Sequence, residues 1–280
     1  MKHRVKYLAL VVLATLAVVL FWQPWQTAGT DNNMAPSPAG VNKTNQPKLS
    51  RNYPFIGLQS TVNTWAARQS GSVSVVVYDL ANHKTAASLN PGRQYFTASI
   101  YKLYVAYIGY QKIADGTYQI NEPYISGYTR GECLDAMIRD SYSPCGERMW
   151  NELGKENLTD KLKTYGLADT SMTALQTSAK DSAIILQRLY EKKDLTNRHQ
   201  DLFLASLKTQ PAQYRRGLPS GFSESTVYTK VGWNGLVDWH DTAIITLPNK
   251  RSYVITVFTQ NIGSAQIRAL GQAIEARRLR

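Results

Sequence analysis

Strand-like segments at both ends of the folded region, with a helical block between them, constrain the fold of this chain more than any other feature. Alternating and β-branched residues predict strands at 72–80, 85–89, 226–231, 241–247 and 252–260. Strands from the two ends can pair in one antiparallel sheet, while the middle block forms an all-helical lobe. We therefore predict an α+β fold, a three-layer α/β/α sandwich with a functional cleft between the sheet and the lobe.

Helical periodicity predicts how the rest of the chain covers this sheet. Apolar residues recur at helical spacing over 55–69, 99–114, 132–139, 145–153, 158–165, 178–192, 198–207 and 264–279. The segment 99–114 is apolar on most faces and ends at Gly116, a glycine C-cap, so we expect it to be buried between sheet and lobe. Residues 94–96, just before it, indicate a short strand or turn.

The amino-terminal region has a different composition. Residues 1–6 are basic, 7–22 are apolar without a charge, and 23–52 are rich in small and polar residues. The apolar run is short for a membrane-spanning helix, which needs about 20 residues. A basic start followed by an apolar core is also typical of a cleavable signal peptide. We expect a cytoplasmic amino terminus, a signal anchor or signal peptide, a flexible linker and a folded domain at 53–280.

This organisation implies that the folded domain lies outside the cytoplasm, at the cell membrane or secreted if the signal is cleaved. The net charge is +12, but the basic residues are scattered and no run of five or more occurs. Nucleic acid is therefore not expected as a partner, and a basic surface beside an anionic cell envelope explains the charge. We expect a monomer.

The segment Thr97 to Lys102 carries the first chemical motif. Ser99 and Lys102 are three residues apart at the start of a helix, so their side chains lie within reach of each other. The first turn also offers free backbone N–H groups and the positive end of the helix dipole. A serine there can become a nucleophile if the lysine loses its proton. By itself, however, Ser-x-x-Lys is common, and a capping serine with a solvated lysine is the simpler explanation.

Further motifs favour the catalytic interpretation of Ser99 and Lys102 over the structural one. Ser-x-x-Lys, Ser-Asp-Asn and Lys-Thr-Gly together are the signature of serine β-lactamases and penicillin-binding proteins. In this chain the motifs that follow Ser99 are Ser141-Tyr142-Ser143, Thr177-Ser178-Ala179-Lys180-Asp181, Gly217-Leu218-Pro219 and Lys230-Val231-Gly232. In this order, from Leu58 to the carboxy terminus, the chain resembles the class A β-lactamase-like serine hydrolases, including the related D,D-peptidases.

The resemblance implies a catalytic set. Ser99 would attack a carbonyl and form an acyl-enzyme. Lys102 would act as the base, with its pKa lowered by burial and by the second cation, Lys230. Ser141 would relay a proton to the leaving nitrogen. No metal and no organic cofactor is implied.

It also implies substrate-binding positions. Ser143 takes the place of the family's asparagine, which holds the catalytic lysine and the substrate amide. Gly232 would let the substrate backbone approach the strand edge. The backbone N–H groups of Ser99 and Trp233 would form the oxyanion hole.

Departures from the family pattern affect the expected activity. Val231 stands where the family has Thr or Ser, and residues 233–243 lack an arginine for the substrate carboxylate. No glutamate lies between Glu156 and Glu191, the region of the family's deacylating glutamate. Asp169 and Gln176 are the nearby polar candidates, and neither matches the motif. We therefore expect slow deacylation.

Other residues have structural interpretations. Cys133 and Cys145 are the only cysteines and flank the Ser-x-Ser turn, so an exported chain would pair them in a disulfide, while a reducing compartment would leave two thiols. The two cysteines have no histidines at ligand spacing, which argues against a metal site. His240 and Asp241 are adjacent rather than facing, which favours a structural role over a catalytic triad.

The sequence thus predicts a membrane-tethered serine hydrolase of the β-lactamase or D,D-peptidase type, acting on β-lactams or peptidoglycan D-alanyl peptides. Two alternatives remain open. The altered motifs also fit a domain that binds cell-wall ligands without turnover. The missing carboxylate contacts also fit an esterase or amidase for ligands without a carboxylate.

Overall fold

This computed structural model describes residues 57–235 and 238–278. The expected amino-terminal segments 1–6, 7–22 and 23–52 lie outside the described residues. Among the helices that are described, none is long and apolar enough to cross a membrane.

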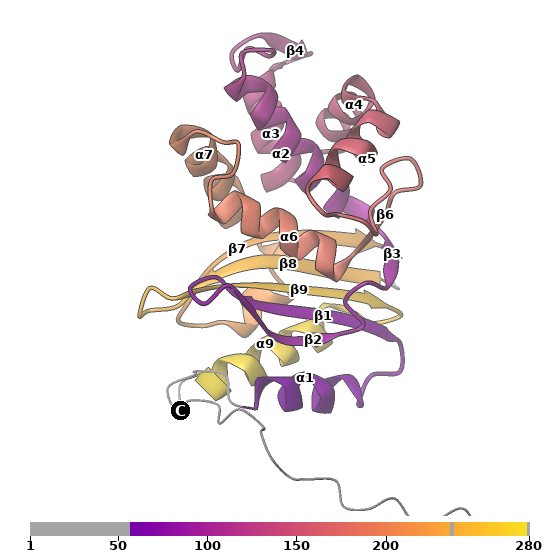
Figure 1. Cartoon of the computed structure of the whole chain (residues 1–280), viewed down its shortest axis with the longest axis vertical. Coiled ribbons are helices and arrows are strands. Elements are labelled where there is room, and N and C mark those ends of the chain that lie inside the picture. The colour runs from indigo at the N-terminus through magenta and orange to yellow at the C-terminus, as the bar shows by residue number, and fades with distance from the viewer. Residues whose placement is uncertain (1–56, 236–237, 279–280) are drawn as a thin grey trace, which may run out of the picture. The chain divides into compact units, whose positions relative to one another are not determined.

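A five-stranded antiparallel sheet forms the middle layer, in the order β2-β1-β9-β8-β7 (Figure 1). The strands are β1 (Ser72–Asp79), β2 (Lys84–Leu89), β7 (Thr226–Asn234), β8 (Asp238–Thr246) and β9 (Ser252–Gln260). The first and last strands of the chain meet in the centre, where Val75 pairs with Val257, and β7 lies at the edge with Lys230 opposite Thr242. The predicted pairing of strands from both chain ends is therefore confirmed.

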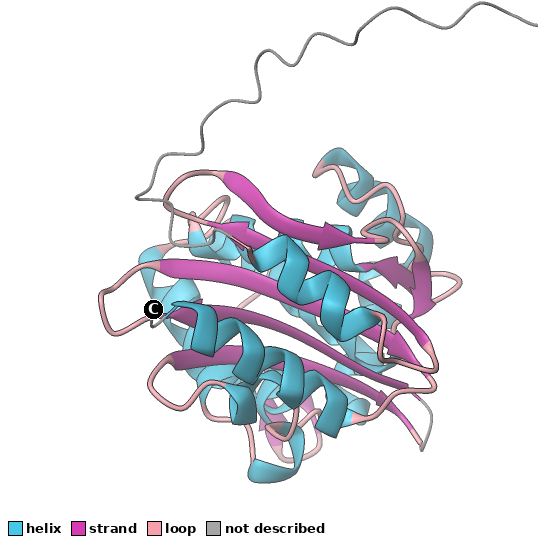
Figure 2. Cartoon of the chain, turned by 90° about the horizontal axis from the view of Figure 1, so that it is seen from below, coloured by secondary structure: helices cyan, strands magenta, loops and turns pink. Residues whose placement is uncertain are grey.

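Helices from the two ends of the chain cover the lower face of the sheet. These are α1 (Leu58–Ala66), α8 (Leu218–Gly221) and α9 (Ser264–Arg278). Figure 2 looks onto this face and shows two helices lying over the sheet, roughly along the direction of the strands. Their apolar residues, such as Leu58, Trp65 and Ile274, pack on Val75, Val257 and other downward-facing strand residues in one core.

The helical lobe covers the upper face. It contains α2 (Tyr101–Ala114), α3 (Arg130–Arg139), α4 (Ser143–Leu153), α5 (Lys155–Thr164), α6 (Ala179–Tyr190) and α7 (Asn197–Lys208). All residues of α2 from Tyr101 to Gln111 are buried, as its uniform apolar pattern predicts. This helix joins the lobe to Val254, Phe258 and Ile244 of the sheet in a second core. The three layers of the predicted sandwich are present.

Short elements connect these layers. They are β3 (Gln94–Phe96), β4 (Pro123–Ile125), β5 (Tyr128–Thr129), β6 (Gln176–Ser178) and the 3-10 helices η1 (Ala98–Ile100) and η2 (Ala212–Tyr214). β3 pairs with β6, which the sequence analysis did not predict. The strands β7 and β8 are also longer than predicted, because pairing continues through Trp233 and Trp239 toward their turn. The first helix is shorter than the predicted 55–69.

Candidate active site

Ser99 lies in η1, in the short connection between β3 and α2. Ala98 has a positive φ of 43°, and Ile100 N donates to Thr97 O at 2.9 Å, which turns the chain sharply before the helix. Thr97 N in turn donates to Leu175 O at 2.7 Å. Ser99 is therefore held at the start of α2 by contacts of the residues around it.

Lys102 is nearly inaccessible, with 1% of its surface exposed. Its Nζ donates to Ser99 Oγ at 3.1 Å, to Ser143 Oγ at 3.0 Å and to Ser141 O at 2.7 Å. Burial lowers the pKa of Lys102 to about 8, and the nearby Glu147 carboxylate partly offsets that shift. A pKa this close to neutrality leaves a useful fraction of the amine free to accept a proton.

Ser141 lies between α3 and α4 with a positive φ of 54°, and its hydroxyl faces the second lysine. Lys230 Nζ donates to Ser141 Oγ at 2.9 Å and to Val231 O at 3.0 Å. Lys230 is fully buried, and its pKa is well below the usual value because of burial and the positive charge of Lys102. Three separate segments thus meet in what we call the lysine–serine cluster: Ser99, Lys102, Ser141, Ser143 and Lys230.

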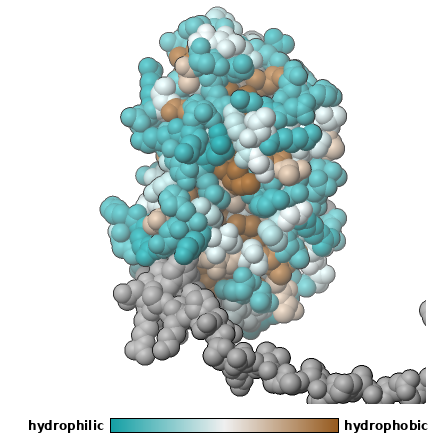
Figure 3. Space-filling view, in the orientation of Figure 1, coloured by the Kyte–Doolittle hydropathy of each residue, from teal (hydrophilic) through white to brown (hydrophobic). Residues whose placement is uncertain are grey.

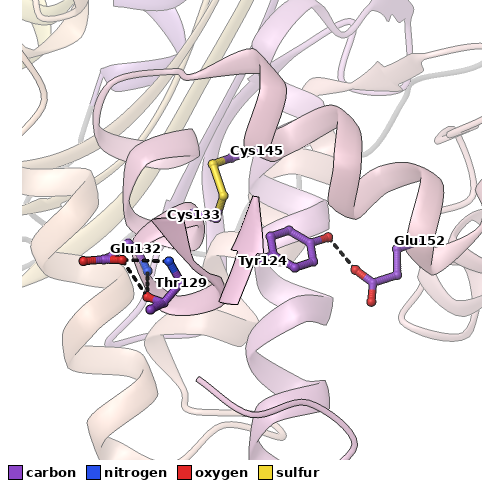
Figure 4. The surroundings of a disulfide bond; sticks show 6 residues. All are labelled: Tyr124, Thr129, Glu132, Cys133, Cys145 and Glu152. Carbon is purple, nitrogen blue, oxygen red and sulfur yellow. Dashed lines mark hydrogen bonds between the residues drawn. A yellow bond between two sulfur atoms is a disulfide. The ribbon is translucent and has the colours of Figure 1, made fainter. Parts of the chain in front are cut away.

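Helix α4 approaches this cluster closely at a glycine. A Cβ on Gly146 would lie 2.9 Å from Lys102 Cε and 3.0 Å from Tyr101 Oη. The residue before it, Cys145, forms a disulfide with Cys133 of α3, 12 residues earlier (Figure 4). The disulfide ties together the two helices that hold the Ser141 turn.

A capping box and an ionic group fix the other end of α3. Thr129 Oγ1 accepts from Glu132 N, and the Glu132 carboxylate accepts from Thr129 N at 2.7 Å (Figure 4). Arg130, 5% exposed, donates to Glu152 of α4 at 2.8 and 3.0 Å and also pairs with Glu122. These contacts hold α3 and α4 side by side at a second point.

A cleft of about 380 Å³ opens beside Ser99 and Lys102. Its wall on α4 includes Glu147 and Trp150, and Leu175 lines another part. Phe96 and Trp233 also line the cleft and are 47% and 51% exposed, although they are large apolar side chains. The face seen in Figure 3 is mainly hydrophilic with apolar residues in small patches.

The Lys-x-Gly stretch of β7 divides between the two faces of the sheet. Lys230 points to the cluster, whereas Val231, 2% exposed, packs into the lower core. Gly232 lies against the chain around Ser99, since a Cβ there would be 2.8 Å from both Thr97 O and Ile100 Cγ1. A glycine at this position is therefore required by the protein's own packing, apart from any substrate.

His240 and Asp241 have structural partners. His240 Nε2 lies 2.8 Å from Phe96 O, and its Nδ1 accepts from Thr259 N at 3.2 Å, so both ring nitrogens are used by the backbone. Asp241 is fully buried below Lys230, and burial raises its pKa to about 7. It accepts hydrogen bonds from Leu218 N at 2.8 Å and from the Thr229 hydroxyl.

The loop 165–175 between α5 and β6 faces the cleft with an apolar residue. Asp169 pairs with Lys180 at 2.8 Å and accepts from Ser178 Oγ at 3.0 Å, so its carboxylate binds two residues at the start of α6. Gln176 is exposed and bridges by its backbone to Ser171. Neither polar candidate from the sequence lines the cleft, whereas Leu175 does.

Glu147 and Leu175 are among the cleft residues that the sequence did not predict. Glu147 is four residues after Ser143, so the helical spacing of α4 could have placed both on one face. Leu175 carried no signal, because its role depends on a loop conformation with a positive φ of 51°.

Comparisons with known proteins concern the family and the fold. A family model described as "Beta-lactamase enzyme family" matches residues 57–277. PBP-A aligns with a TM-score of 0.70 and 20% identity, over 79% of this chain and 95% of its own. A β-lactamase from Xanthomonas campestris pv. campestris gives 0.71 and 15%, over 78% of this chain and 96% of its own. An ancestral class A β-lactamase gives 0.71 and 18%, over 78% and 98%.

A search of curated proteins found no match. At identities of 15 to 20%, the structural likeness concerns the fold alone, and it confirms the predicted β-lactamase/transpeptidase-like fold.

Proposed function

Because this chain belongs to the beta-lactamase enzyme family, we propose that it is a serine hydrolase that acts through an acyl-enzyme on Ser99. Its substrates would be β-lactams or the D-alanyl peptides of peptidoglycan. The observation that carries the proposal is the 3.1 Å contact between Lys102 Nζ and Ser99 Oγ, where a buried amine with a lowered pKa meets a hydroxyl. The conformation of η1 brings this hydroxyl to the cleft.

The acylation step follows from these contacts. Neutral Lys102 takes the proton of Ser99 Oγ, and the oxygen attacks the carbonyl carbon of the substrate. The bond between that carbon and the leaving nitrogen breaks as the new bond to Oγ forms. The proton reaches the leaving nitrogen through Ser141, whose hydroxyl is held by Lys230 at 2.9 Å. The N–H groups of Ser99 and Trp233 are the proposed oxyanion hole.

Substrate contacts involve the remaining predicted residues. Ser143 lies 3.0 Å from Lys102 Nζ, so it can orient the lysine and a substrate amide at the same time. Trp233 lines the cleft from β7, and Gly232 beside it lets β7 pack against the chain around Ser99. The exposed ring of Trp233 offers an apolar surface to a ligand.

Slow deacylation is part of the proposal. The loop 165–175 presents Leu175 to the cleft, and the carboxylate of Asp169 is bound elsewhere. Water that attacks the acyl-enzyme thus finds no base on that loop. A mutant of PBP-A is described as an acyl-enzyme complex with penicillin G, and we propose that this chain forms a comparable adduct.

The proposed location is outside the cytoplasm. The basic residues 1–6 and the uncharged apolar run 7–22 support a signal anchor or a signal peptide. A β-lactam or peptidoglycan substrate is consistent with that side of the membrane.

The test is the intact mass of the purified chain after incubation with benzylpenicillin, followed by peptide mapping. We expect an adduct of the mass of penicillin on Ser99 that persists for minutes or longer, and no adduct on Ser99→Ala. An equal adduct on Ser99→Ala would contradict the proposal. If neither protein reacts, the cleft serves another acyl substrate or binds a cell-wall ligand without turnover.

One observation favours a second candidate, an esterase or amidase for ligands without a carboxylate. Val231 packs into the lower core, and the hydroxyl of Thr229, the other neighbour of Lys230 on β7, is buried and donates to Asp241, so neither residue offers a hydroxyl to a substrate carboxylate. Turnover of uncharged aryl esters, without labelling by penicillin, would support this candidate over the first.

A further inference from the structure

An acidic side chain from α4 stands in the cleft that contains Ser99. Glu147 lines this cleft together with Ser99, Lys102 and Ser143. Among the residues that line it, Glu147 carries the one carboxylate, and the remaining charged groups are Lys102 and Lys155. The chain thus has an acid in the cleft, although the loop 165–175 presents none there.

The position of Glu147 follows from the helix. It lies one turn after Ser143, on the same face of α4, and Ser143 Oγ is 3.0 Å from Lys102 Nζ. Gly146, just before it, lies against Lys102 Cε and Tyr101 Oη without room for a Cβ. The backbone of α4 therefore passes the catalytic lysine at close range, and Glu147 projects from that point.

The carboxylate is available for chemistry. Glu147 is exposed to solvent, and within the described part of the chain no hydrogen bond or ion pair holds it. It acts electrostatically on two groups of the cleft, raising the pKa of Lys102 against the effect of burial and adding to the burial that raises the pKa of Tyr101. Lys155 is the other ionisable neighbour, with its Nζ 4.0 Å from the Trp150 ring.

We propose that Glu147, on helix α4, is the general base of deacylation. It would take the role that a glutamate of the loop region has in the family. This inference rests on the proposed function, since it requires an acyl group on Ser99. Glu147 would then be responsible for the hydrolysis of the acyl-enzyme, however slow that hydrolysis is.

The step balances as follows. Glu147 accepts a proton from water as the water oxygen bonds to the acyl carbon. Acylation leaves Lys102 neutral, so Lys102 first receives the water-derived proton from Glu147 through the solvent of the cleft. The bond between the acyl carbon and Ser99 Oγ breaks as Lys102, 3.1 Å away, passes this proton to Oγ and becomes neutral again. The products are the free acid and the starting enzyme.

The experiment loads the full chain with benzylpenicillin, removes the excess and follows the loss of adduct mass with time. The variant Glu147→Gln should keep the adduct at least about tenfold longer, because positioned bases contribute about 10²–10⁴-fold. The variant Glu156→Gln is the matched control, an exposed glutamate at the start of α5 outside the cleft lining, and it should lose the adduct at the wild-type rate.

Two readouts separate a base from a structural role. Acylation of Glu147→Gln at pH 7 should not slow, because removing this charge favours neutral Lys102. In Glu147→Ala, added formate should restore part of the adduct loss by entering the vacated space as an external base.

The outcomes are distinct. Adduct loss by Glu147→Gln at the wild-type rate would overturn the inference and leave the proposed function intact. Slowing of acylation and deacylation together, without rescue by formate, would also overturn it, since Glu147 would then only shape the cleft. If the wild type forms no adduct at all, the proposed function fails at Ser99 and the inference fails with it.

Discussion

The lysine–serine cluster, which contains Ser99, and the loop 165–175, which lines the same cleft through Leu175, use their polar groups differently. In the cluster, Lys102 and Lys230 direct their Nζ atoms to three serine side chains and to backbone carbonyls at 2.7 to 3.1 Å. In the loop, Asp169 binds Lys180 and Ser178 instead, and Thr170 donates to Asp181 at 2.8 Å. The polar groups of the cluster contact one another around Ser99, whereas those of the loop attach the loop to the start of α6.

This difference separates the two halves of a hydrolytic cycle. Acylation requires a nucleophile, a base and a route for the proton, the roles that we propose for Ser99, Lys102 and Ser141 of the cluster. Deacylation requires a second base for water, and the loop offers Leu175. An enzyme built in this way should acylate readily and release the acyl group slowly.

The largest expected effect comes from removing the base of the cluster. Lys102→Met keeps the volume of a buried side chain but not its amine, so acylation by penicillin should fall by about 10³-fold. Lys112→Met, at a partly exposed lysine in the last turn of the same helix, is the control and should acylate normally. The rate of adduct formation by mass spectrometry measures both. Retention of more than a tenth of the wild-type rate in Lys102→Met would contradict the assignment.

The next effect concerns the support of the cluster. Replacing both Cys133 and Cys145 by serine removes a cross-link of 12 residues and should lower the free energy of unfolding by about 3 kcal/mol. Urea denaturation followed by circular dichroism measures this change. The adduct lifetime should stay close to the wild-type value at low temperature, because Arg130 and Glu152 still hold α3 against α4, the helix that carries Glu147. An unchanged denaturation midpoint would show that other contacts between α3 and α4, including Arg130 with Glu152, are sufficient.

A carboxylate at position 175 would give the loop 165–175 the base in the cleft that it lacks. Leu175→Glu should shorten the adduct lifetime by about 10- to 100-fold, because it adds a base in the cleft beside Ser99. Leu175→Gln has the same length without a charge and should not shorten it. Equal lifetimes in the two variants would mean that residue 175 does not reach the attacking water.

The pH dependence of acylation gives the smallest effect. Burial lowers the pKa of Lys102 from 10.5 to about 8, and only the neutral amine can take the Ser99 proton. The acylation rate should therefore rise about tenfold from pH 7 to a plateau above about pH 9. Stopped-flow acylation at several pH values tests this, and a rate that is flat or falling over this range would contradict it. In Glu147→Gln the rise should occur at lower pH.

The sequence predicted the sheet, the lobe and the cluster because each leaves a local pattern. β-branched runs mark the strands, helical periodicity marks α2, and the spacing of Ser99 and Lys102 implies a shared helix face. Asp169 and Gln176, the polar residues that do not match the motif of the deacylating glutamate, lie outside the cleft lining.

What the sequence could not predict depends on long-range packing. The pairing of β3 with β6 joins residues about 80 positions apart, and it sets the loop that presents Leu175. The sequence gives no reason for a glycine at position 146. In the structure, a Cβ on Gly146 would lie 2.9 Å from Lys102 Cε, so no larger residue fits there. Glu147 becomes a candidate base only once α4 is placed against α2.

The most direct test of the account is a rapid-mixing experiment with a chromogenic cephalosporin in excess over the full chain. We expect a burst of about one product per enzyme molecule followed by a much slower steady rate, because acylation outpaces deacylation. A linear time course of rapid turnover without a burst would contradict it, since deacylation would then not be the slow step.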